Sequence, residues 1–403
     1  MRLADTPALG HLTYCTNIHA GETWPEVLSG LKTHLPAIKA AVAPDQAFGV
    51  GLRLSAAAAE ALQEPAALDD LRALLAEGPY YIFTINGFPY GTFHGKTVKE
   101  GAYRPDWSQA ARLAYTNQLA DLLAGLLPTG MAGSISTVPG TFKPWAEGRV
   151  EAITENLIQH VAHLVRLTDD QGCEIALALE PEPCCFLETI EETLAYFQDH
   201  LFGRAAVQRL AALTGRSAAE SEAALHRHIG VCYDVCHAAV EFEDPRDSIA
   251  RLQAAGIAIP KVQLSAALRI AAVGPETIEQ LRPFDEPVYL HQTVERSDEG
   301  LVRHLDLPQA LAHAEQAVGR EWRIHFHVPI FLDQLKDFGT TQAFLREILA
   351  LHREAPICQQ LEVETYTWDV LPERYRELGL SAAIARELNW VKDQLGIEQR
   401  LAS

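Results

Sequence analysis

Apolar runs of β type alternate along the whole chain with amphipathic stretches rich in alanine and leucine. This alternation is typical of βα units, in which helices cover a parallel sheet. We predict strands at 11–16, 48–54, 80–85, 133–138, 175–180, 230–235, 261–265, 322–328 and 361–366. The predicted helical stretches are 24–43, 56–77, 107–126, 149–170, 188–228, 245–255, 274–282, 307–318, 340–353 and 372–396.

Eight strands close a β/α barrel, and the pattern gives nine, so one strand is expected to lie outside the barrel. We expect it to be 322–328 or its neighbour, in an insertion before the last barrel strand. The sequence has no internal repeat, low-complexity tract or linker-like boundary. It therefore indicates one (β/α)8 TIM-barrel domain over residues 1–403. Its expected insertions are a lid-like loop at about 86–106, a helical segment at about 203–228 and a third at about 266–330.

Composition narrows the choice of partner. Of 403 residues, 48% are hydrophobic and 21% charged, which is ordinary for a globular chain. The net charge of −20 argues against a nucleic-acid partner, because such binding depends on Lys and Arg neutralising phosphates. The seven cysteines include no Cys-x-x-Cys pair, residues 1–10 carry no apolar signal segment, and no apolar run is long enough to span a bilayer. We therefore expect reduced thiols, a cytoplasmic location and no membrane span.

Two histidines, His325 and His327, stand one residue apart in the predicted strand 322–328. Side chains alternate between the faces of a strand, so both imidazoles are expected to point to one side. This spacing suits a pair of metal ligands. An exposed edge strand with two surface histidines would have the same sequence, so the interpretation depends on the other strand ends.

Several predicted strands end in polar side chains, at the edge where a β/α barrel carries its chemistry. Carboxylates that directly follow four or five apolar residues need partners if they are buried, and a shared metal satisfies several at once. A solvated strand end would explain Glu180 alone, and a helix cap would explain Asp234 alone. Together they favour a metal site. The polar residues at these ends are Glu180, Glu182, Asp234, His237, Gln263, Glu364 and, before the 322–328 segment, His291.

The chain resembles the xylose-isomerase-like superfamily of β/α barrels, which includes sugar isomerases, sugar epimerases and enzymes of the endonuclease IV type. Within it, residues 12–19, 86–91 and 325–329 resemble the EboE family of metabolite-traffic proteins. The resemblance runs over essentially the whole chain. It implies a metal-binding carboxylate after strand five, which falls on Glu180, and an acidic-x-x-His element after strand six, which falls on Asp234 and His237. It also implies a ligand on strand seven, at Gln263, and a carboxylate on the last strand, at Glu364. In two-metal members a further ligand pair follows strand seven, and His325 and His327 stand at that place.

Two departures from the superfamily pattern are visible. Gln263 is a weaker ligand than the His or Asp usual at that position, and Arg53 and Asn86 stand where the endonuclease branch has histidines. The mixed oxygen and nitrogen ligands suit Zn²⁺, Mn²⁺ or Fe²⁺ better than Mg²⁺, with one or two ions bound. We also count His291 among the candidate ligands.

The resemblance implies isomerisation or epimerisation of a small polyol or sugar-like carbonyl compound. Glu180 and Glu364 are the candidate proton-transfer groups, one on each side of the substrate. The candidate substrate contacts are Arg53, Asn86, His94, Glu182 and His19. Two alternatives stay open: a metal-containing protein that binds a metabolite and passes it to pathway enzymes, and an endonuclease-type phosphodiesterase, which the charge of −20 disfavours.

Overall fold

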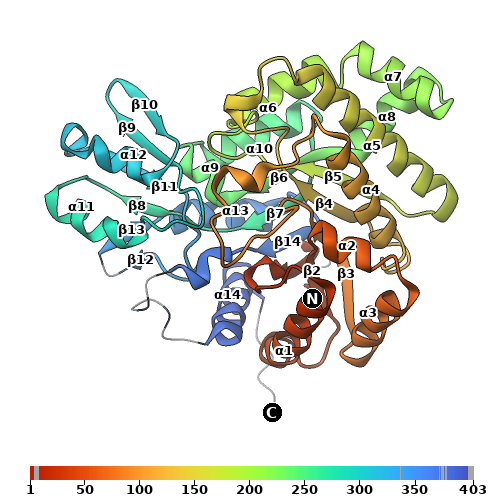
Figure 1. The fold of residues 1–403 in the computed structure, drawn as a ribbon, viewed down its shortest axis with the longest axis horizontal. Helices are drawn as coiled ribbons and strands as arrows, with labels where there is room; N and C mark the ends of the chain where they lie inside the picture. The colour runs from red at the N-terminus through yellow and green to blue at the C-terminus, as the bar shows by residue number, and fades with distance from the viewer. Residues whose placement is uncertain (4–8, 336, 372, 374–375, 377–378, 398–403) are drawn as a thin grey trace.

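Eight parallel strands form a barrel in the computed structural model, which describes residues 1–3, 9–335, 337–371, 373, 376 and 379–397. The hydrogen-bonded order is β1-β14-β7-β6-β5-β4-β3-β2 (Figure 1). A parallel bridge between Cys15 and Gly51 brings β1 back to β2, so the ring closes. The strands are β1 (His11–Tyr14), β2 (Phe48–Arg53), β3 (Tyr80–Asn86), β4 (Gly133–Thr137), β5 (Ile175–Leu179), β6 (Ile229–Asp234), β7 (Ala258–Leu264) and β14 (Gln360–Val363). The predicted (β/α)8 barrel is confirmed.

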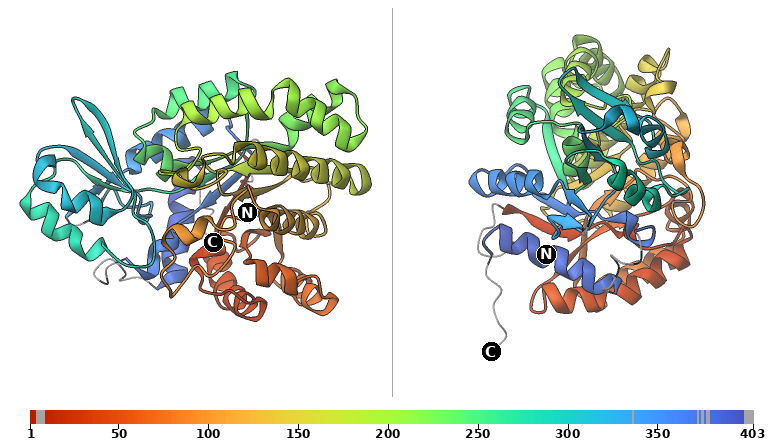
Figure 2. Two further views of the ribbon diagram at one scale, coloured as in Figure 1. Left: turned by 45° about the horizontal axis from the view of Figure 1, so that its top comes forward. Right: turned by 90° about the vertical axis from the view of Figure 1, so that its left-hand side faces the viewer.

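Helices surround the barrel (Figures 1 and 2). Their boundaries differ from the prediction where a proline or a capping residue begins a new helix. The stretch 56–77 is two helices, because Pro65 begins the second. The stretch 188–228 is three helices, and Ser217 and Glu220 form the expected capping box at the start of the last. The helices are α1 (Trp24–Val42), α2 (Ala56–Ala61), α3 (Pro65–Glu77), α4 (Ala110–Ala124), α5 (Val150–Gln171), α6 (Ile190–Tyr196), α7 (Arg204–Thr214), α8 (Ala218–His228), α9 (Val235–Val240), α10 (Pro245–Ala254), α13 (Gln342–Glu354) and α14 (Leu380–Gln394). The start of the predicted helix 372–396 falls mainly on residues outside the described ranges.

A second sheet lies between β7 and β14 in the sequence and beside the mouth of the barrel in space (Figure 2). Its six strands pair antiparallel in the order β10-β9-β11-β8-β13-β12, with two short helices, α11 (Pro275–Leu281) and α12 (Leu307–Ala312), between them. The ninth predicted strand therefore does lie outside the barrel. The strands are β8 (Leu268–Ile270), β9 (Thr293–Ser297), β10 (Gly300–His304), β11 (Glu321–Ile324), β12 (Gln334–Leu335) and β13 (Phe338–Thr340), so this sheet reaches ten residues past the expected end at 330.

The strand predicted at 322–328 ends earlier, at Ile324. The backbone turns there, because Phe326 N–H donates to the Ile324 carbonyl instead of to a neighbouring strand. Val328 N–H then donates to the Ala266 carbonyl, which ties the segment to the end of β7. His325 and His327 consequently sit on a short irregular connection that runs from the inserted sheet back to the barrel.

A lysine and a glutamate form an ion pair inside the barrel. Lys261 on β7 and Glu362 on β14 have fully buried side chains and contact each other. Glu362 approaches β2 so closely that a Cβ on Gly51 would lie 2.4 Å from its Oε1. Glycine at that position makes room for the carboxylate.

Glu387 on α14 carries a pH-dependent contribution to stability. Its Oε1 accepts hydrogen bonds from Ile330 N–H (3.1 Å) and Thr365 Oγ1–H (2.7 Å), while burial raises its pKa from 4.5 to about 7. Between about pH 4.5 and pH 7 the folded protein therefore holds a proton that the unfolded chain has released, so this contribution is largest below about pH 4.5 and is lost as the pH rises towards 7.

Glu387→Gln keeps both acceptor contacts without the charge. We expect the variant to exceed the wild type in free energy of unfolding by about 3 kcal/mol at about pH 8, and the difference to vanish near pH 4.5. Urea midpoints at the two pH values measure this, and a difference independent of pH would contradict it.

All seven cysteines are free. Within the described residues, every helix is too short or too polar to cross a membrane.

Candidate functional site

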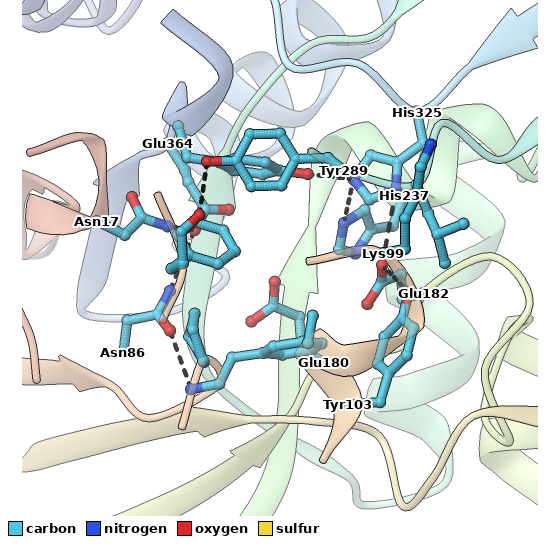
Figure 3. A pocket seen from close by; sticks show the side chains of 16 residues that line it. Asn17, Asn86, Lys99, Tyr103, Glu180, Glu182, His237, Tyr289, His325 and Glu364 are labelled. Carbon is cyan, nitrogen blue, oxygen red and sulfur yellow. Dashed lines mark hydrogen bonds and ion pairs between the residues drawn. The ribbon is translucent and has the colours of Figure 1, made fainter. Parts of the chain in front are cut away.

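A cavity lies at the carboxyl ends of the barrel strands (Figure 3). Glu180, which follows β5, and Glu364, which follows β14, face it from the barrel, and His237 and His325 form one wall. The aromatic rings of Phe88, Phe93, Tyr103, Tyr289 and Tyr366 are also part of the lining. Barrel and insertions thus both contribute to one partly apolar site, the usual form of a small-molecule pocket.

Three buried histidines converge at the wall of this cavity. The Nε2 atom of His325 lies 3.1 Å from Nε2 of His237 and 3.2 Å from Nε2 of His327. All three side chains are buried, so the predicted His-x-His pair is not on an exposed edge. We call His237, His325 and His327 the histidine triad.

The opposite nitrogen of each triad ring is held by an acceptor. Nδ1 of His237 lies 3.0 Å from the Pro181 carbonyl, and Nδ1 of His327 lies 3.0 Å from the Glu364 carbonyl. A carbonyl oxygen cannot donate, so both Nδ1 atoms carry the proton and the Nε2 lone pairs face inward. Backbone and second-layer acceptors of this kind commonly fix the orientation of metal-binding imidazoles.

His325 is held in the same manner by Gln292. Its Nδ1 lies 2.7 Å from Gln292 Oε1, while Gln292 Nε2 donates to the Pro183 carbonyl (3.1 Å) and to Tyr103 Oη (2.9 Å). The Pro183 carbonyl fixes the amide orientation, because only the NH₂ group can face it. His325 therefore also presents a lone pair at Nε2.

Three inward lone pairs at 3.1–3.2 Å repel one another unless a cation lies among them. Burial, His237 and His327 hold the pKa of His325 well below its usual value, and burial lowers the pKa of His327 to about 4. Burial would also lower the pKa of His237, but Asp234, Glu182 and Glu180 raise it. A proton on His237 relieves one of the two close contacts, whereas a metal ion relieves both.

Asp234 supplies the oxygen that such an ion needs. Its Oδ1 accepts from His237 N–H (3.0 Å) and Ser265 Oγ–H (2.8 Å), but its buried Oδ2 has no hydrogen-bond partner among the described residues and lies 4.0 Å from His237 Nε2. One carboxylate oxygen of Asp234 lies within 4.8 Å of ring nitrogens of His237 and His327, and imidazole together with carboxylate is a ligand combination that zinc takes. The residues present therefore fit a divalent metal.

A second group of carboxylates adjoins the triad. One oxygen each of Glu180, Asp234 and Glu364 lies within 4.8 Å of the others. Burial and the neighbouring Asp234 raise the pKa of Glu180 to about 7, and burial with Glu180 and Asp234 raises that of Glu364 well above its usual value. Burial also acts to raise the pKa of Asp234, but the nearby His237 and His327 outweigh it and hold that pKa low. Asp234 belongs to both groups, so the two candidate metal-binding groups share one carboxylate.

Amide groups orient the two glutamates. Asn17 Nδ2 and Asn86 Nδ2 donate to Glu364 Oε1 at 2.7 and 3.1 Å (Figure 3). Gln263 Nε2 lies 3.3 and 3.5 Å from the two oxygens of Glu180. Gln263, a predicted metal ligand, thus turns its amide nitrogen to Glu180, while its buried Oε1 has no hydrogen-bond partner among the described residues.

His291, also an expected ligand, is not brought to the metal group. Its Nε2 lies 2.8 Å from Glu286 Oε1, and its Nδ1 lies 3.0 Å from the His325 carbonyl. Both ring nitrogens are therefore occupied. His291 supports the backbone of His325 from behind.

The expected substrate contacts divide into two sets. Asn86 and Glu182 line the cavity. Arg53 does not: it is buried, and its guanidinium binds Glu22 and the Gly21 and Gly91 carbonyls. It joins the β1–α1 loop to the 86–106 loop and has no position from which to hold a substrate carboxylate or phosphate.

His94 and His19 also lie outside the cavity lining. His94 Nε2 lies 2.6 Å from the Asn17 carbonyl and its Nδ1 lies 3.1 Å from Tyr289 Oη. His19 stacks on His34 at 4.2 Å and contacts Tyr14 Oη at 2.9 Å. Both histidines pack behind the cavity wall.

Two insertions meet above the cavity. The N–H groups of Val98 and Lys99 donate to the Val288 carbonyl at 2.7 and 2.9 Å, and Tyr289 Oη donates to the Phe93 carbonyl at 2.9 Å. Lys99 Nζ lies 2.7 Å from Asp306 Oδ2. We call these contacts the roof latch. Lys99 is the only Lys or Arg among the described lining residues, and it is already paired.

Sequence reasoning missed Asn17, Tyr103, Gln292 and Tyr366. Asn17 lies in the 12–19 stretch that carries the family resemblance, and Tyr366 stands two residues after Glu364. Those were usable signals. Gln292 and Tyr103 had none, because their roles arise from contacts between segments distant in the sequence.

Comparisons with known proteins give structural likenesses only. No family model matches the chain, and no curated protein matches it. A crystal structure of IOLI protein with a zinc atom is 13% identical with a TM-score of 0.44, covering 97% of this chain and 100% of that one. A D-tagatose 3-epimerase-like protein is 14% identical with a TM-score of 0.39, covering 63% and 75%. The apo 3-keto-D-glucoside 4-epimerase YcjR from E. coli is 15% identical with a TM-score of 0.34, covering 76% and 98%. Likenesses of this size assign no activity to this chain.

Proposed function

We propose that this chain is a metal-dependent isomerase or epimerase of a small sugar or polyol carbonyl compound, within the xylose-isomerase-like superfamily. One observation carries the proposal: two buried glutamates with raised pKa values, Glu180 and Glu364, face a cavity that is also lined by His237 and His325 of the histidine triad. Buried carboxyl groups with raised pKa values suit general acid–base work.

The metal would be held by Asp234 and the histidine triad. The nitrogen-rich set suits Zn²⁺ among the metals considered, and Glu180 with Glu364 offers the place for a second ion. When bound, the metal supplies positive charge that polarises a carbonyl and makes the adjacent C–H bond acidic.

The protein's own groups then move the proton. One glutamate takes the proton from the carbon next to the carbonyl, the C–H electron pair enters the carbon–carbon bond, and the carbonyl π electrons move to oxygen. Return of a proton to that carbon from the other glutamate inverts it. Return to the former carbonyl carbon isomerises the compound, provided that the proton of the adjacent hydroxyl passes to the former carbonyl oxygen, so that the hydroxyl-bearing carbon becomes the new carbonyl. Asn17 and Asn86 hold Glu364, and Gln263 holds Glu180, so both carboxylates stay at fixed positions.

The cavity favours a substrate without phosphate or carboxylate. Its described lining has three glutamates, and its single lysine is paired with Asp306. Hydroxyl groups can donate to these acceptors, whereas an anion would be repelled. The 86–106 loop and the inserted segment meet over the cavity, which suits a small molecule better than a DNA duplex and counts against the phosphodiesterase alternative.

Solvent exchange tests the proposal. Zinc-loaded protein in D₂O is expected to introduce deuterium next to the carbonyl of at least one compound in a panel of unphosphorylated ketoses, aldoses and cyclic polyol ketones, detected by NMR. Glu180→Gln is expected to slow this exchange by at least about a hundredfold while the triad keeps its metal. Glu387→Gln is the matched control, since Glu387 is also buried with a pKa near 7 but lies away from the cavity lining, and it is expected to retain exchange.

A second candidate is a metabolite-binding and traffic role of the EboE type at the same site. The roof latch favours it, because several contacts join two insertions over the cavity and would help to retain a bound molecule. Tight binding of a panel compound without any deuterium exchange by the metal-loaded wild type would support this role and contradict the isomerase.

A further inference from the structure

Neither the proposed metal site nor the proposed proton transfer uses the hydroxyl group of Tyr366. It lines the cavity two residues after Glu364, and its Oη lies 3.3 Å from His325 Nε2. Among the described residues this is its only hydrogen bond. Gln292 fixes the proton of His325 on Nδ1, so Nε2 is the acceptor and the tyrosine is the donor.

The same lone pair cannot serve both the tyrosine and a metal ion. Nε2 of His325 is one of the three converging nitrogens of the triad. A cation bound there takes that lone pair, and the Tyr366 hydroxyl loses its acceptor. A hydroxyl at the cavity wall without a partner then seeks an acceptor inside the cavity, because an unsatisfied polar group is costly.

The tyrosine ring is fixed by its neighbours. It packs on Phe93 at 5.2 Å, on Tyr289 at 5.1 Å and on His327 at 4.6 Å between ring centroids. The hydroxyl therefore stays beside the triad when the hydrogen bond to His325 is lost. It remains directed at the part of the cavity that the metal faces.

We infer that Tyr366 is a ligand-binding residue whose hydroxyl donates, in the metal-bound protein, to an oxygen of the molecule held in the cavity. This inference rests on the metal site of the proposed function and not on the isomerase reaction. For that reaction it would identify a donor aimed at the oxygen on which negative charge develops. In the metal-free protein the same hydroxyl instead satisfies His325.

Tyr366→Phe tests the inference with cobalt as the reporter. We would measure Co²⁺ binding by its visible absorption and then titrate acetohydroxamate, a small oxygen ligand, into the cobalt-loaded protein. In the variant, Co²⁺ should bind as tightly as in wild type or a few times more tightly, because the ion no longer competes with the tyrosine for His325. Acetohydroxamate should bind about tenfold more weakly, the loss of one hydrogen bond.

Tyr115→Phe is the control. Tyr115 is buried outside the described cavity lining and its hydroxyl donates to the Leu54 carbonyl, so hydroxamate affinity should not change. Weaker Co²⁺ binding in Tyr366→Phe would overturn the inference by making the tyrosine a metal ligand. Equal hydroxamate affinity in Tyr366→Phe and wild type, or no hydroxamate binding by wild type, would also overturn it. Neither result depends on turnover, so failure here and failure of the isomerase proposal are separable.

Discussion

Replacing His325 with alanine is expected to weaken zinc binding by more than about a hundredfold, because a structural zinc site gains roughly 10–16 kcal/mol from about four ligands. His325 is the central member of the triad, with its Nε2 within 3.2 Å of both other Nε2 atoms. Its removal leaves two imidazoles and Asp234. Competition with a chelator of known zinc affinity measures the change directly.

Two other histidines of the inserted segment provide comparisons. His313 is exposed and contacts the Gln309 carbonyl, so His313→Ala should leave zinc affinity unchanged. His291→Gln distinguishes a metal ligand from a residue that only supports the site. The two ring nitrogens of His291 contact Glu286 and the His325 carbonyl, so only a small loss of zinc affinity is expected. A loss in His291→Gln as large as that in His325→Ala would make His291 a ligand after all. Stoichiometric, tight zinc in His325→Ala would contradict the triad as the metal site.

Glu362→Gln is expected to destabilise the fold by about 3–5 kcal/mol, because it leaves the Lys261 ammonium buried without a counter-charge. Both side chains of the pair are fully buried within the barrel. Burial alone would lower the pKa of Lys261, but Glu362 outweighs it and holds the lysine charged. The urea midpoint and the slope of the unfolding transition measure the loss of stability.

The double variant Lys261→Met, Glu362→Leu tests the cause. Replacement of both charges removes the desolvation penalty together with the attraction, so it should restore most of the stability lost in Glu362→Gln. If the double variant were no more stable than the single one, the loss would come from packing around Gly51 and Glu362, which approach closely, and not from the unpaired charge.

The barrel was predictable from the sequence because its signal is local. Each βα unit repeats one pattern of apolar and amphipathic residues, and the surplus ninth run marked the insertion before β14. The inserted sheet was less predictable. Its strands have two to five residues and pair antiparallel with partners up to 72 residues away in the sequence, so their hydrogen bonds leave little periodicity in the sequence.

The site was predictable in its charged members and not in its neutral ones. Glu180, Asp234, His237, His325, His327 and Glu364 stand out because charged groups directly follow apolar strands, and the structure brings them together. Gln292 and Tyr103 act through neutral hydrogen bonds whose partners are distant in the sequence. Arg53 shows the converse: a cation at a strand end is conspicuous in the sequence, yet its partner Glu22 lies on a neighbouring loop and occupies it.

The roof latch has a consequence for the speed of ligand exchange. The two sides of the roof belong to loops that follow different barrel strands, β3 and β7, so they can separate without disturbing the barrel sheet. Separation has to break the Val288 and Phe93 carbonyl contacts and the Lys99–Asp306 ion pair together. Entry and release then follow the frequency of this opening and not the rate of diffusion to the barrel mouth. A molecule in the cavity would accordingly remain bound for a time fixed by the insertions, even where its contacts with the barrel are few.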